Sequence, residues 1–245
     1  MMCTRRFDVH SEEVNNKMTD LTGRTVLIAG ATSRSGLVAA QTLVDAGANV
    51  IAVGHDPVKL EQLAARLAAD AAWMTEACDL TDERAVDGLA ERLHAQDVRV
   101  DGVLHLVGGW RGGGGLAGQS DADYRVLERS LTALRFVTRA FEGDLRASSA
   151  ARLAMVSSTA VARPLAGGAN YAAVKAASEA WMRAVGQGFA KAARDAAADL
   201  AAASTVFRVK TLDGLEQALA DRFVALWDED AAEVNGTVIE LAAAA

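Results

Sequence analysis

The sequence predicts a single α/β domain built on a seven-stranded, doubly wound parallel sheet flanked by helices. Short apolar runs typical of buried strands alternate with longer amphipathic stretches almost from end to end. A length of 245 residues suits one large domain, and no linker, repeat or composition shift divides it. Residues 1–18 mix charges of both signs without an apolar core, so we expect a flexible tail followed by one folded domain over 19–245.

Each expected element corresponds to one such run. Strands are expected at Thr25–Ala29, Asn49–Val53, Trp73–Ala77, Val103–Val107, Leu153–Ser157, a segment ending near Val209, and Thr237–Leu241. Helices are expected from the first glycine-rich turn through Ala46, then at Lys59–Ala69, Glu83–Ala95, Ala122–Leu145, a long stretch carrying Tyr171 and Lys175, and Leu215–Trp227. Because a helical crossover joins strands in parallel, this alternation predicts a parallel sheet with both faces covered.

Composition narrows the classes of function. Hydrophobic residues make up 51% of the chain and its formal net charge is −7, which argues against a nucleic-acid surface. With only Cys3 and Cys78, a disulfide framework or a cysteine-rich zinc site is excluded, and a reducing cytoplasm fits best. No apolar run is long enough for a membrane helix. The four histidines lack ligand spacing, so no metal is expected.

The turn after the first expected strand has features of a phosphate-binding loop. Gly30 permits a tight turn and Gly36 a close backbone approach. Amides around Ser35 and Leu37 then face a phosphate at the start of the next helix. The turn does not match the pattern G-x-G-x-x-G, so a plain strand–helix connection is an equally good interpretation of this segment alone.

A tyrosine and a lysine four residues apart are the strongest indication of chemistry. Tyr171 and Lys175 lie on one face of the expected helix, one turn apart. A phenol titrates near pH ~10, and a neighbouring ammonium favours the phenolate, so we expect Lys175 to lower the pKa of Tyr171. Ser158 precedes Tyr171 by 13 residues and supplies a hydroxyl beside the pair. The alternative is a surface helix with a chance lysine.

Taken in chain order, these motifs resemble the short-chain dehydrogenase/reductase family over residues 20–241. The resemblance implies a Rossmann fold, a nicotinamide cofactor and hydride transfer to or from a carbonyl carbon. It assigns catalysis to Ser158, Tyr171 and Lys175, with Ser130 in place of the usual helix asparagine. It assigns the cofactor to Gly30, Ser33, Arg34, Ser35, Gly36, Leu37, His55, Asp79, Leu80, Val107, Gly108, Gly109, Tyr171 and Lys175.

The end of the second strand decides the cofactor prediction. A site that prefers NAD places a carboxylate there for the ribose 2′-hydroxyl, and that carboxylate repels a 2′-phosphate. The corresponding residue resembles Gly54, and His55 follows it. With Arg34 also nearby, NADP is predicted over NAD. Two alternatives stay open: Asp56 turns back to the ribose, or Arg34 pairs with a surface carboxylate.

The loop at Gly108–Gly115 is unusually rich in glycine. It predicts a mobile flap in which Trp110 stacks on a flat substrate; the alternative is a surface turn whose tryptophan packs against the domain. Its Gly-Gly-Trp run is similar to the dihydropteridine reductase branch of the family, although that branch lacks the serine kept here as Ser158. The short connection at Lys210–Gly214 leaves little chain for a lid, so an open substrate site is expected.

Two classes of function remain at this stage. The first is an NAD(P)-dependent carbonyl reductase or alcohol dehydrogenase acting on a small molecule. The second is a non-catalytic dinucleotide-binding redox sensor with the same fold. The complete set of Ser158, Tyr171 and Lys175 favours the enzyme. The resemblance also implies a homodimer or homotetramer formed through helices 122–145 and 171–193.

Overall fold

The computed structural model describes residues 19–67 and 72–242; the tail predicted at 1–18 lies outside this part of the chain. Within it, one seven-stranded sheet has the order β3-β2-β1-β4-β5-β6-β7, with every neighbouring pair parallel. The strands are β1 (Thr25–Ala29), β2 (Asn49–Gly54), β3 (Trp73–Ala77), β4 (Gly102–His105), β5 (Arg152–Ser158), β6 (Ala203–Val209) and β7 (Val238–Glu240). The predicted doubly wound parallel sheet is confirmed.

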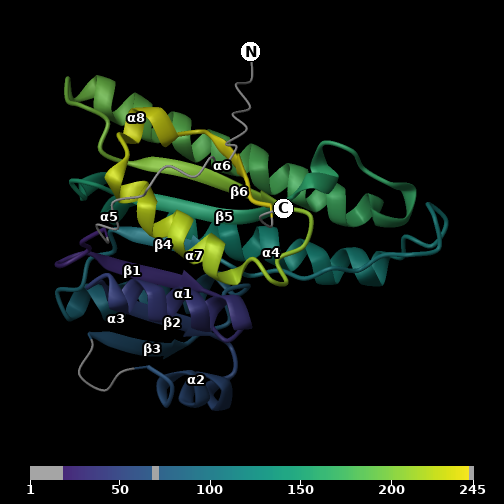
Figure 1. The fold of residues 1–245 in the computed structure, drawn as a ribbon, viewed down its shortest axis with the longest axis horizontal. Coiled ribbons are helices and arrows are strands. Elements are labelled where there is room, and N and C mark those ends of the chain that lie inside the picture. Colours follow the sequence, from purple (N-terminus) through teal and green to yellow (C-terminus); the bar gives the residue numbers. More distant parts are fainter. Residues whose placement is uncertain (1–18, 68–71, 243–245) are drawn as a thin grey trace.

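Helices connect the strands and cover both faces of the sheet. The α-helices of the described segments are α1 (Arg34–Asp45), α2 (Pro57–Ala64), α3 (Glu83–Ala95), α4 (Asp121–Ala140), α5 (Glu142–Ala147), α6 (Ala169–Asp195), α7 (Glu216–Val224) and α8 (Ala231–Val234). Short 3-10 turns η1 (Thr159–Val161) and η2 (Ala166–Gly168) precede α6, and η3 (Ala225–Asp228) follows α7. Figure 1 shows α6 as the long helix along one side of the sheet.

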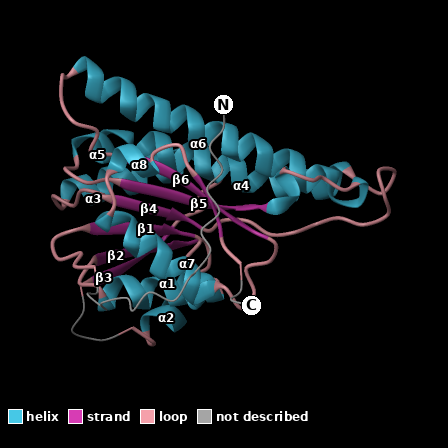
Figure 2. Cartoon of the chain, turned by 45° about the horizontal axis from the view of Figure 1, so that its top comes forward, coloured by secondary structure: helices cyan, strands magenta, loops and turns pink. Residues whose placement is uncertain are grey.

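Two apolar cores lie on opposite faces of the sheet. In β1, Val26 and Ile28 belong to the core shared with α1 and α7, whereas Leu27 belongs to the core shared with α3, α4 and α6. Successive strand residues point to opposite faces, so burial on both faces requires the continuous apolar run seen in this strand. Figure 2 shows the sheet between these helical layers.

Several element boundaries differ from the sequence prediction; in the sheet, β4 ends at His105 rather than Val107. Helix α2 begins at Pro57 rather than Lys59, because the Asp56 carboxylate accepts hydrogen bonds from the next amides and proline suits the first helical position. The helix predicted to span 122–145 is divided at Phe141, which lies between α4 and α5. The last predicted helix ends at Val224, and η3 continues the turn.

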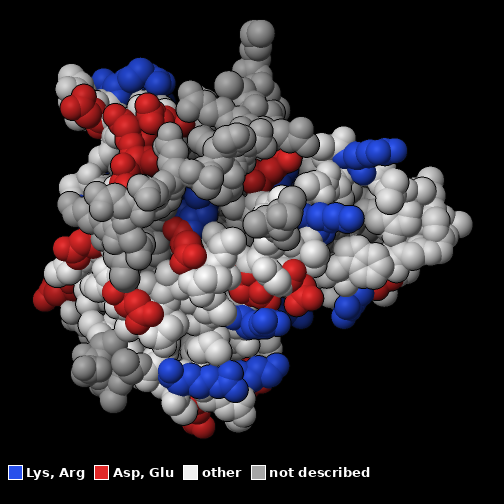
Figure 3. Space-filling view, in the orientation of Figure 1, with Lys and Arg blue, Asp and Glu red and all other residues white. Residues whose placement is uncertain are grey.

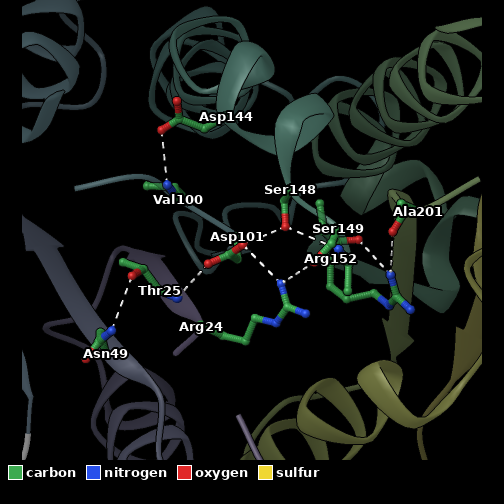
Figure 4. Close-up of polar contacts among 12 residues, drawn as sticks. Arg24, Thr25, Asn49, Val100, Asp101, Asp144, Ser148, Ser149, Arg152 and Ala201 are labelled. Atoms are coloured by element: carbon green, nitrogen blue, oxygen red, sulfur yellow. Dashed lines mark hydrogen bonds and ion pairs between the residues drawn. The ribbon is translucent and has the colours of Figure 1, made fainter. Parts of the chain in front are cut away.

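The amino ends of the central strands are closed by a polar network (Figure 4). Asp101 accepts hydrogen bonds from the backbone amide of Thr25 at 3.0 Å and from the Ser148 hydroxyl at 2.6 Å, and it pairs with Arg24 at 3.4 Å. Buried Arg152 donates to backbone carbonyls, including that of Ala201 at 3.0 Å. These contacts fill this edge of the sheet, which leaves the carboxyl ends of the strands as the edge where loops open to a ligand.

Strand order places the switch point between β1 and β4, where the chain returns to the centre of the sheet and continues to its other side. Ligands of open α/β sheets bind in the crevice outside the carboxyl ends of the strands at such a point. The loops after β1, β4 and β5 all start at this edge. The segments around 108–118 and 160–168 extend well beyond the sheet (Figures 1 and 2).

Candidate active site

The turn between β1 and α1 brings its backbone close to the start of the helix. Gly30 has a φ of +89°. A Cβ on Gly36 would lie 2.1 Å from the carbonyl oxygen of Ala31, so only glycine fits there. The Ser33 hydroxyl caps α1 by accepting a hydrogen bond from the Gly36 amide at 3.0 Å. The N-terminus of α1 is therefore held at the switch point, where it favours an anion.

A cavity of about 630 Å³ opens beside this turn. Its walls come from the turn itself and from the ends of β2, β3 and β4. The predicted cofactor residues that line it are Gly30, Ser33, His55, Asp79, Leu80, Val107, Gly108 and Gly109. Lys59 on α2 and Arg129 on α4 also line it, and Arg129 lies 3.7 Å from the carboxylate of Asp79.

Besides Tyr171 and Lys175, which line a second cavity, four predicted cofactor residues are not among the residues that line this one. They are Arg34, Ser35, Gly36 and Leu37, all in the first turn of α1. The guanidinium of Arg34 lies 3.3 Å from Glu216 and 3.6 Å from Asp213, so the surface ion pair left open as its alternative is the one observed. Asp56 is the N-cap of α2 and lies 3.9 Å from Lys59.

A second cavity of about 1160 Å³ contains the predicted catalytic residues Ser158, Tyr171 and Lys175. The segment from Leu106 to Trp110 lines both cavities, so they adjoin along the loop after β4. Together they form a continuous groove across the switch point. One end faces the α1 turn, and the other faces a tyrosine, a serine and a lysine.

Backbone groups of β5 and of the turn after it hold two of the three side chains, Ser158 and Lys175. Ser158 is the last residue of β5, and its hydroxyl accepts a hydrogen bond from the Ala160 amide at 3.1 Å. Lys175 donates to the carbonyl oxygen of Val156 at 2.8 Å, and its Nζ lies 5.9 Å from the centroid of the Tyr171 ring. Because α6 carries both residues one turn apart, the ammonium and the phenol lie side by side.

The electrostatics of this trio differ from the sequence prediction. Burial raises the pKa of Tyr171, and the hydrogen bond with Ser158 partly counteracts that rise. The expectation that Lys175 lowers the pKa of Tyr171 is therefore not met in this structure; the lowering partner is Ser158. Burial also lowers the pKa of Lys175 to about 8, against the opposing field of Glu179.

Ser130 and His105 form a buried pair behind the trio. The Nε2–H of His105 donates to the carbonyl oxygen of Ser130 at 3.1 Å, and the Ser130 hydroxyl donates to the carbonyl oxygen of Leu127 at 2.8 Å. Burial lowers the pKa of His105 to about 3, so its ring is neutral. Ser130 lines the first cavity, whereas His105 lines the second. The Ser130 hydroxyl is thus occupied locally in this structure.

The glycine-rich loop is tied down rather than free. The Gln119 side-chain amide donates to the carbonyl oxygens of Gly113, Gly115 and Gly167 at 3.0–3.2 Å, and its oxygen accepts from the Asn170 amide. A Cβ on Gly112 would lie 2.4 Å from the carbonyl oxygen of Gly167. Trp110 is 61% exposed, so its ring does not pack against the domain core. The loop therefore presents an open indole at the wall of both cavities.

Five cationic residues at the two cavities were missed from the sequence: Lys59, Arg111 and Arg129 at the first cavity, and Arg163 and Lys210 at the second. Lys59 lies in the first turn of α2 and lines the first cavity. A helix predicted to start just after the second strand was the signal in the sequence that could have identified it. Arg163 follows η1, and Lys210 follows β6. Nothing local in the sequence brings these last two together, because their cavity forms only when the loops after β5 and β6 meet.

Two further properties concern the described segments alone. Among residues 19–67 and 72–242, no group of three or more His, Cys, Asp or Glu side chains is placed to hold a metal ion. The helices of the same residues include none that is both long and apolar enough to span a bilayer.

With this geometry defined, comparison with known proteins identifies the family. The sequence profile described as short chain dehydrogenase matches residues 24–194. The chain belongs to this family, whose members are in general NAD(P)-dependent oxidoreductases. The family resemblance predicted from Gly30, Ser158, Tyr171 and Lys175 is confirmed. The similarity to the dihydropteridine reductase branch is not confirmed.

Individual relatives are similar over part of the chain. A Streptomyces sp. (strain C5) protein named as a daunorubicin C-13 ketoreductase is 40% identical over 91 residues, 36% of this chain and 32% of the relative. A fatty acyl-CoA reductase of Acinetobacter baylyi is 33% identical over 87 residues, 35% of this chain and 30% of the relative. Each match thus spans about a third of the relative's length.

Solved structures support the fold over nearly the whole chain. A short chain dehydrogenase from Shigella flexneri, solved in complex with NADP, has a TM-score of 0.78 at 21% identity. The alignment covers 91% of this chain and 99% of that one. At this identity, the likeness shows that the two proteins share a fold.

Proposed function

We propose that this protein is an NAD(P)-dependent carbonyl reductase or alcohol dehydrogenase that prefers NADPH and uses Tyr171 as its general acid and base. The observation that carries this proposal is the placement of Tyr171, Ser158 and Lys175 in one cavity adjoining the cavity beside the α1 turn. A dinucleotide has two ends, and the groove offers a site to each. The intact trio favours an enzyme over a sensor, which needs only the binding groove.

The residues around the α1 turn fit a pyrophosphate. Gly30 and Gly36 have backbone positions that a Cβ would obstruct, and the N-terminus of α1 is aimed at the switch point. Asp79 and Leu80 would contact the adenine end. A bound nicotinamide would donate a hydride to the substrate's carbonyl carbon during reduction, or accept one from the alcohol carbon during oxidation.

Residues of this chain then transfer the proton and stabilise the substrate oxygen. Tyr171 gives its phenolic proton to the substrate oxygen during reduction and recovers one during oxidation. Ser158 donates a hydrogen bond toward the same oxygen, where negative charge develops. Lys175, fixed by the carbonyl oxygen of Val156 in the same cavity, would hold the nicotinamide ribose.

The charges around the first cavity support NADPH as the preferred cofactor. Gly54 ends β2 without a carboxylate, and Asp56 is occupied as the cap of α2. His55 and Lys59 line the cavity at this point. The side chains of both residues would form hydrogen bonds with a 2′-phosphate, whereas a 2′-hydroxyl would lack its usual acidic partner. The role first given to Arg34, which pairs with Glu216, is assigned here to Lys59.

A pair of binding titrations tests the cofactor assignment. Energy transfer from tryptophan to a bound nicotinamide measures the Kd for NADPH and for NADH. Lys59→Gln weakens NADPH binding by about tenfold and leaves NADH unchanged, because only the 2′-phosphate loses a partner. Lys191→Gln, an exposed lysine on α6, is the matched control. Equal weakening for both cofactors, or preference for NADH in the unchanged protein, contradicts the assignment.

Turnover tests the chemistry. The oxidation of NADPH by a neutral aromatic aldehyde, methyl para-formylbenzoate, is followed with the unchanged protein and with Tyr171→Phe. The variant retains NADPH binding and loses roughly 10²–10⁴ in rate, because the general acid is absent. Binding of NADPH without any turnover in the unchanged protein would instead favour the redox sensor.

A further inference from the structure

The second cavity has a charge balance opposite to that of the whole chain. The protein carries a formal net charge of −7. Among the described residues that line this cavity, none is Asp or Glu, whereas Arg163, Lys175 and Lys210 are all cationic. Lys175 is fixed to the carbonyl oxygen of Val156 and belongs to the trio. Arg163 and Lys210 are left without a role in the reaction.

Arg163 and Lys210 are exposed and unpaired within the described part of the chain. Neither makes an ion pair or hydrogen bond with any residue described there, unlike Arg34, Arg129 and Arg139, which all pair with carboxylates. Arg163 lies on the loop that begins at Ser158 and ends at Tyr171, so it approaches the cavity from the side that carries the reacting hydroxyls. Lys210 approaches from the end of β6, the neighbouring strand.

Large apolar side chains line the same cavity as these two cations. Trp110 is 61% exposed and Leu165 is 71% exposed, and both line the cavity. Exposed apolar groups of this size at a cavity wall favour a ligand with a flat or aliphatic body. Figure 3 shows Lys and Arg side chains bordering the uncharged surface at the protruding end of the molecule. Apolar walls and free cations together suit an amphiphilic anion.

We propose that the substrate of this site is an acidic carbonyl compound, with an apolar body against Trp110 and Leu165 and an anionic group held by Arg163 and Lys210. This assignment rests on the proposed carbonyl reduction. A guanidinium binds a carboxylate or a phosphate with two parallel hydrogen bonds, and an ammonium adds a point charge. The two cations therefore orient the carbonyl toward Tyr171 and Ser158.

Three matched aldehydes test the proposal. The probes are para-formylbenzoate, para-formylphenyl phosphate and the neutral methyl para-formylbenzoate, each reduced with NADPH. The unchanged protein has a kcat/KM at least about tenfold higher for an anionic probe than for the ester, as expected for a charge-assisted contact. The better of the two anions identifies carboxylate or phosphate as the recognised group.

Variants assign the preference to the two cations. Arg163→Gln and Lys210→Gln each reduce the ratio of anion to ester by severalfold, and the double variant brings it near one, with the rate for the ester preserved. Arg194→Gln, an exposed and unpaired arginine at the far end of α6, leaves the ratio unchanged. The Kd for NADPH is measured for every variant, because a rise in Lys210→Gln would assign that lysine to the cofactor and remove it from the proposed site.

The outcomes distinguish failure of the anion site from failure of the proposed carbonyl reduction. Reduction of all three probes at equal kcat/KM overturns the anion site and leaves the reductase standing. An anion preference that survives the double variant also overturns it. No reduction of any probe, with NADPH bound, overturns the reductase and the substrate class together. An anion preference lost only in the cation variants supports both.

Discussion

Lys175 donates a hydrogen bond to the carbonyl oxygen of Val156 at 2.8 Å, two residues before Ser158 on β5. The contact fixes the tip of a long side chain against the strand that carries the serine. It also places the ammonium 5.9 Å from the Tyr171 ring. The lysine is therefore positioned before any ligand arrives, and its rotamer entropy is already lost in the folded protein.

This buried ammonium makes stability depend on pH. Burial lowers the pKa of Lys175 from 10.5 to about 8, so between these values the unfolded chain binds more protons than the folded one. The free energy of unfolding thus rises with pH across this interval. Lys175→Met removes the cost of burying the charge, so at pH 7 the variant is more stable by up to about 3 kcal/mol.

Urea unfolding at pH 7, 9 and 10.5 tests this prediction. The advantage of Lys175→Met should shrink steadily above pH 8 and disappear near pH 10.5, where the lysine is neutral in both states. Lys191→Met, at an exposed position on α6, gives no such slope. An advantage that does not change with pH would show that the variant acts through packing alone.

Ser158 is predicted to set the pH range of the reaction. Its hydrogen bond lowers the pKa of Tyr171, which burial raises. Ser158→Ala therefore raises the pKa of Tyr171 further and moves the alkaline limb of the kcat/KM profile for reduction to higher pH. The rate also falls by about 10²–10³, because the donor to the developing oxyanion is lost. A limb that stays in place, or moves down, contradicts the structural assignment; Ser149→Ala is the control.

Glu179 is predicted to be a strong determinant of folding stability. It is 1% exposed and accepts hydrogen bonds from the Ser157 hydroxyl at 2.7 Å and from the Arg208 guanidinium at 2.8 and 2.6 Å. Glu179→Ala leaves the cation buried without its partner and costs about 3–5 kcal/mol of unfolding free energy. Replacing the pair together, as Glu179→Leu with Arg208→Met, recovers most of that loss. A double variant as unstable as the single one contradicts this account.

Gln119 is predicted to hold the glycine-rich loop in place. Its side-chain amide bonds three glycine carbonyls from two different loops. Gln119→Ala should increase hydrogen exchange at 108–118 and at 165–168 together and raise the KM more than it lowers kcat, because Trp110 loses its fixed position. Gln96→Ala, which removes a hydrogen bond within α3, leaves both regions unchanged. Faster exchange at only one of the loops would show that Gln119 does not couple them.

The sequence predicted the elements with strong local patterns. The bounds of β1 and β3 match the predicted runs, and α3 is found at Glu83–Ala95 as predicted, with Asp82 as its cap. Where two apolar stretches continue across a break, as at Phe141 between α4 and α5, periodicity alone predicted one helix. The family motifs also predicted that Ser158, Tyr171 and Lys175 act together. In the structure, all three line the second cavity.

Contacts between distant segments were beyond local reasoning. Arg34 was assigned to a phosphate, but its partners are Asp213, in the connection after β6, and Glu216, the first residue of α7. The effect of burial on Tyr171 depends on loops that meet only in the fold. Arg163 and Lys210 converge on one cavity from separate loops, so neither was recognisable as part of a site.

Deuterium transfer from NADPH measures whether hydride passes to the substrate with the help of Tyr171. NADPH carrying deuterium on one face of C4 is incubated with the protein and methyl para-formylbenzoate, and the alcohol product is analysed by mass spectrometry. We expect one deuterium at the carbinol carbon from one of the two C4 stereoisomers, and loss of product with Tyr171→Phe although NADPH stays bound. An alcohol without deuterium from either stereoisomer, or one formed equally well by the Tyr171→Phe variant, would contradict hydride transfer assisted by Tyr171.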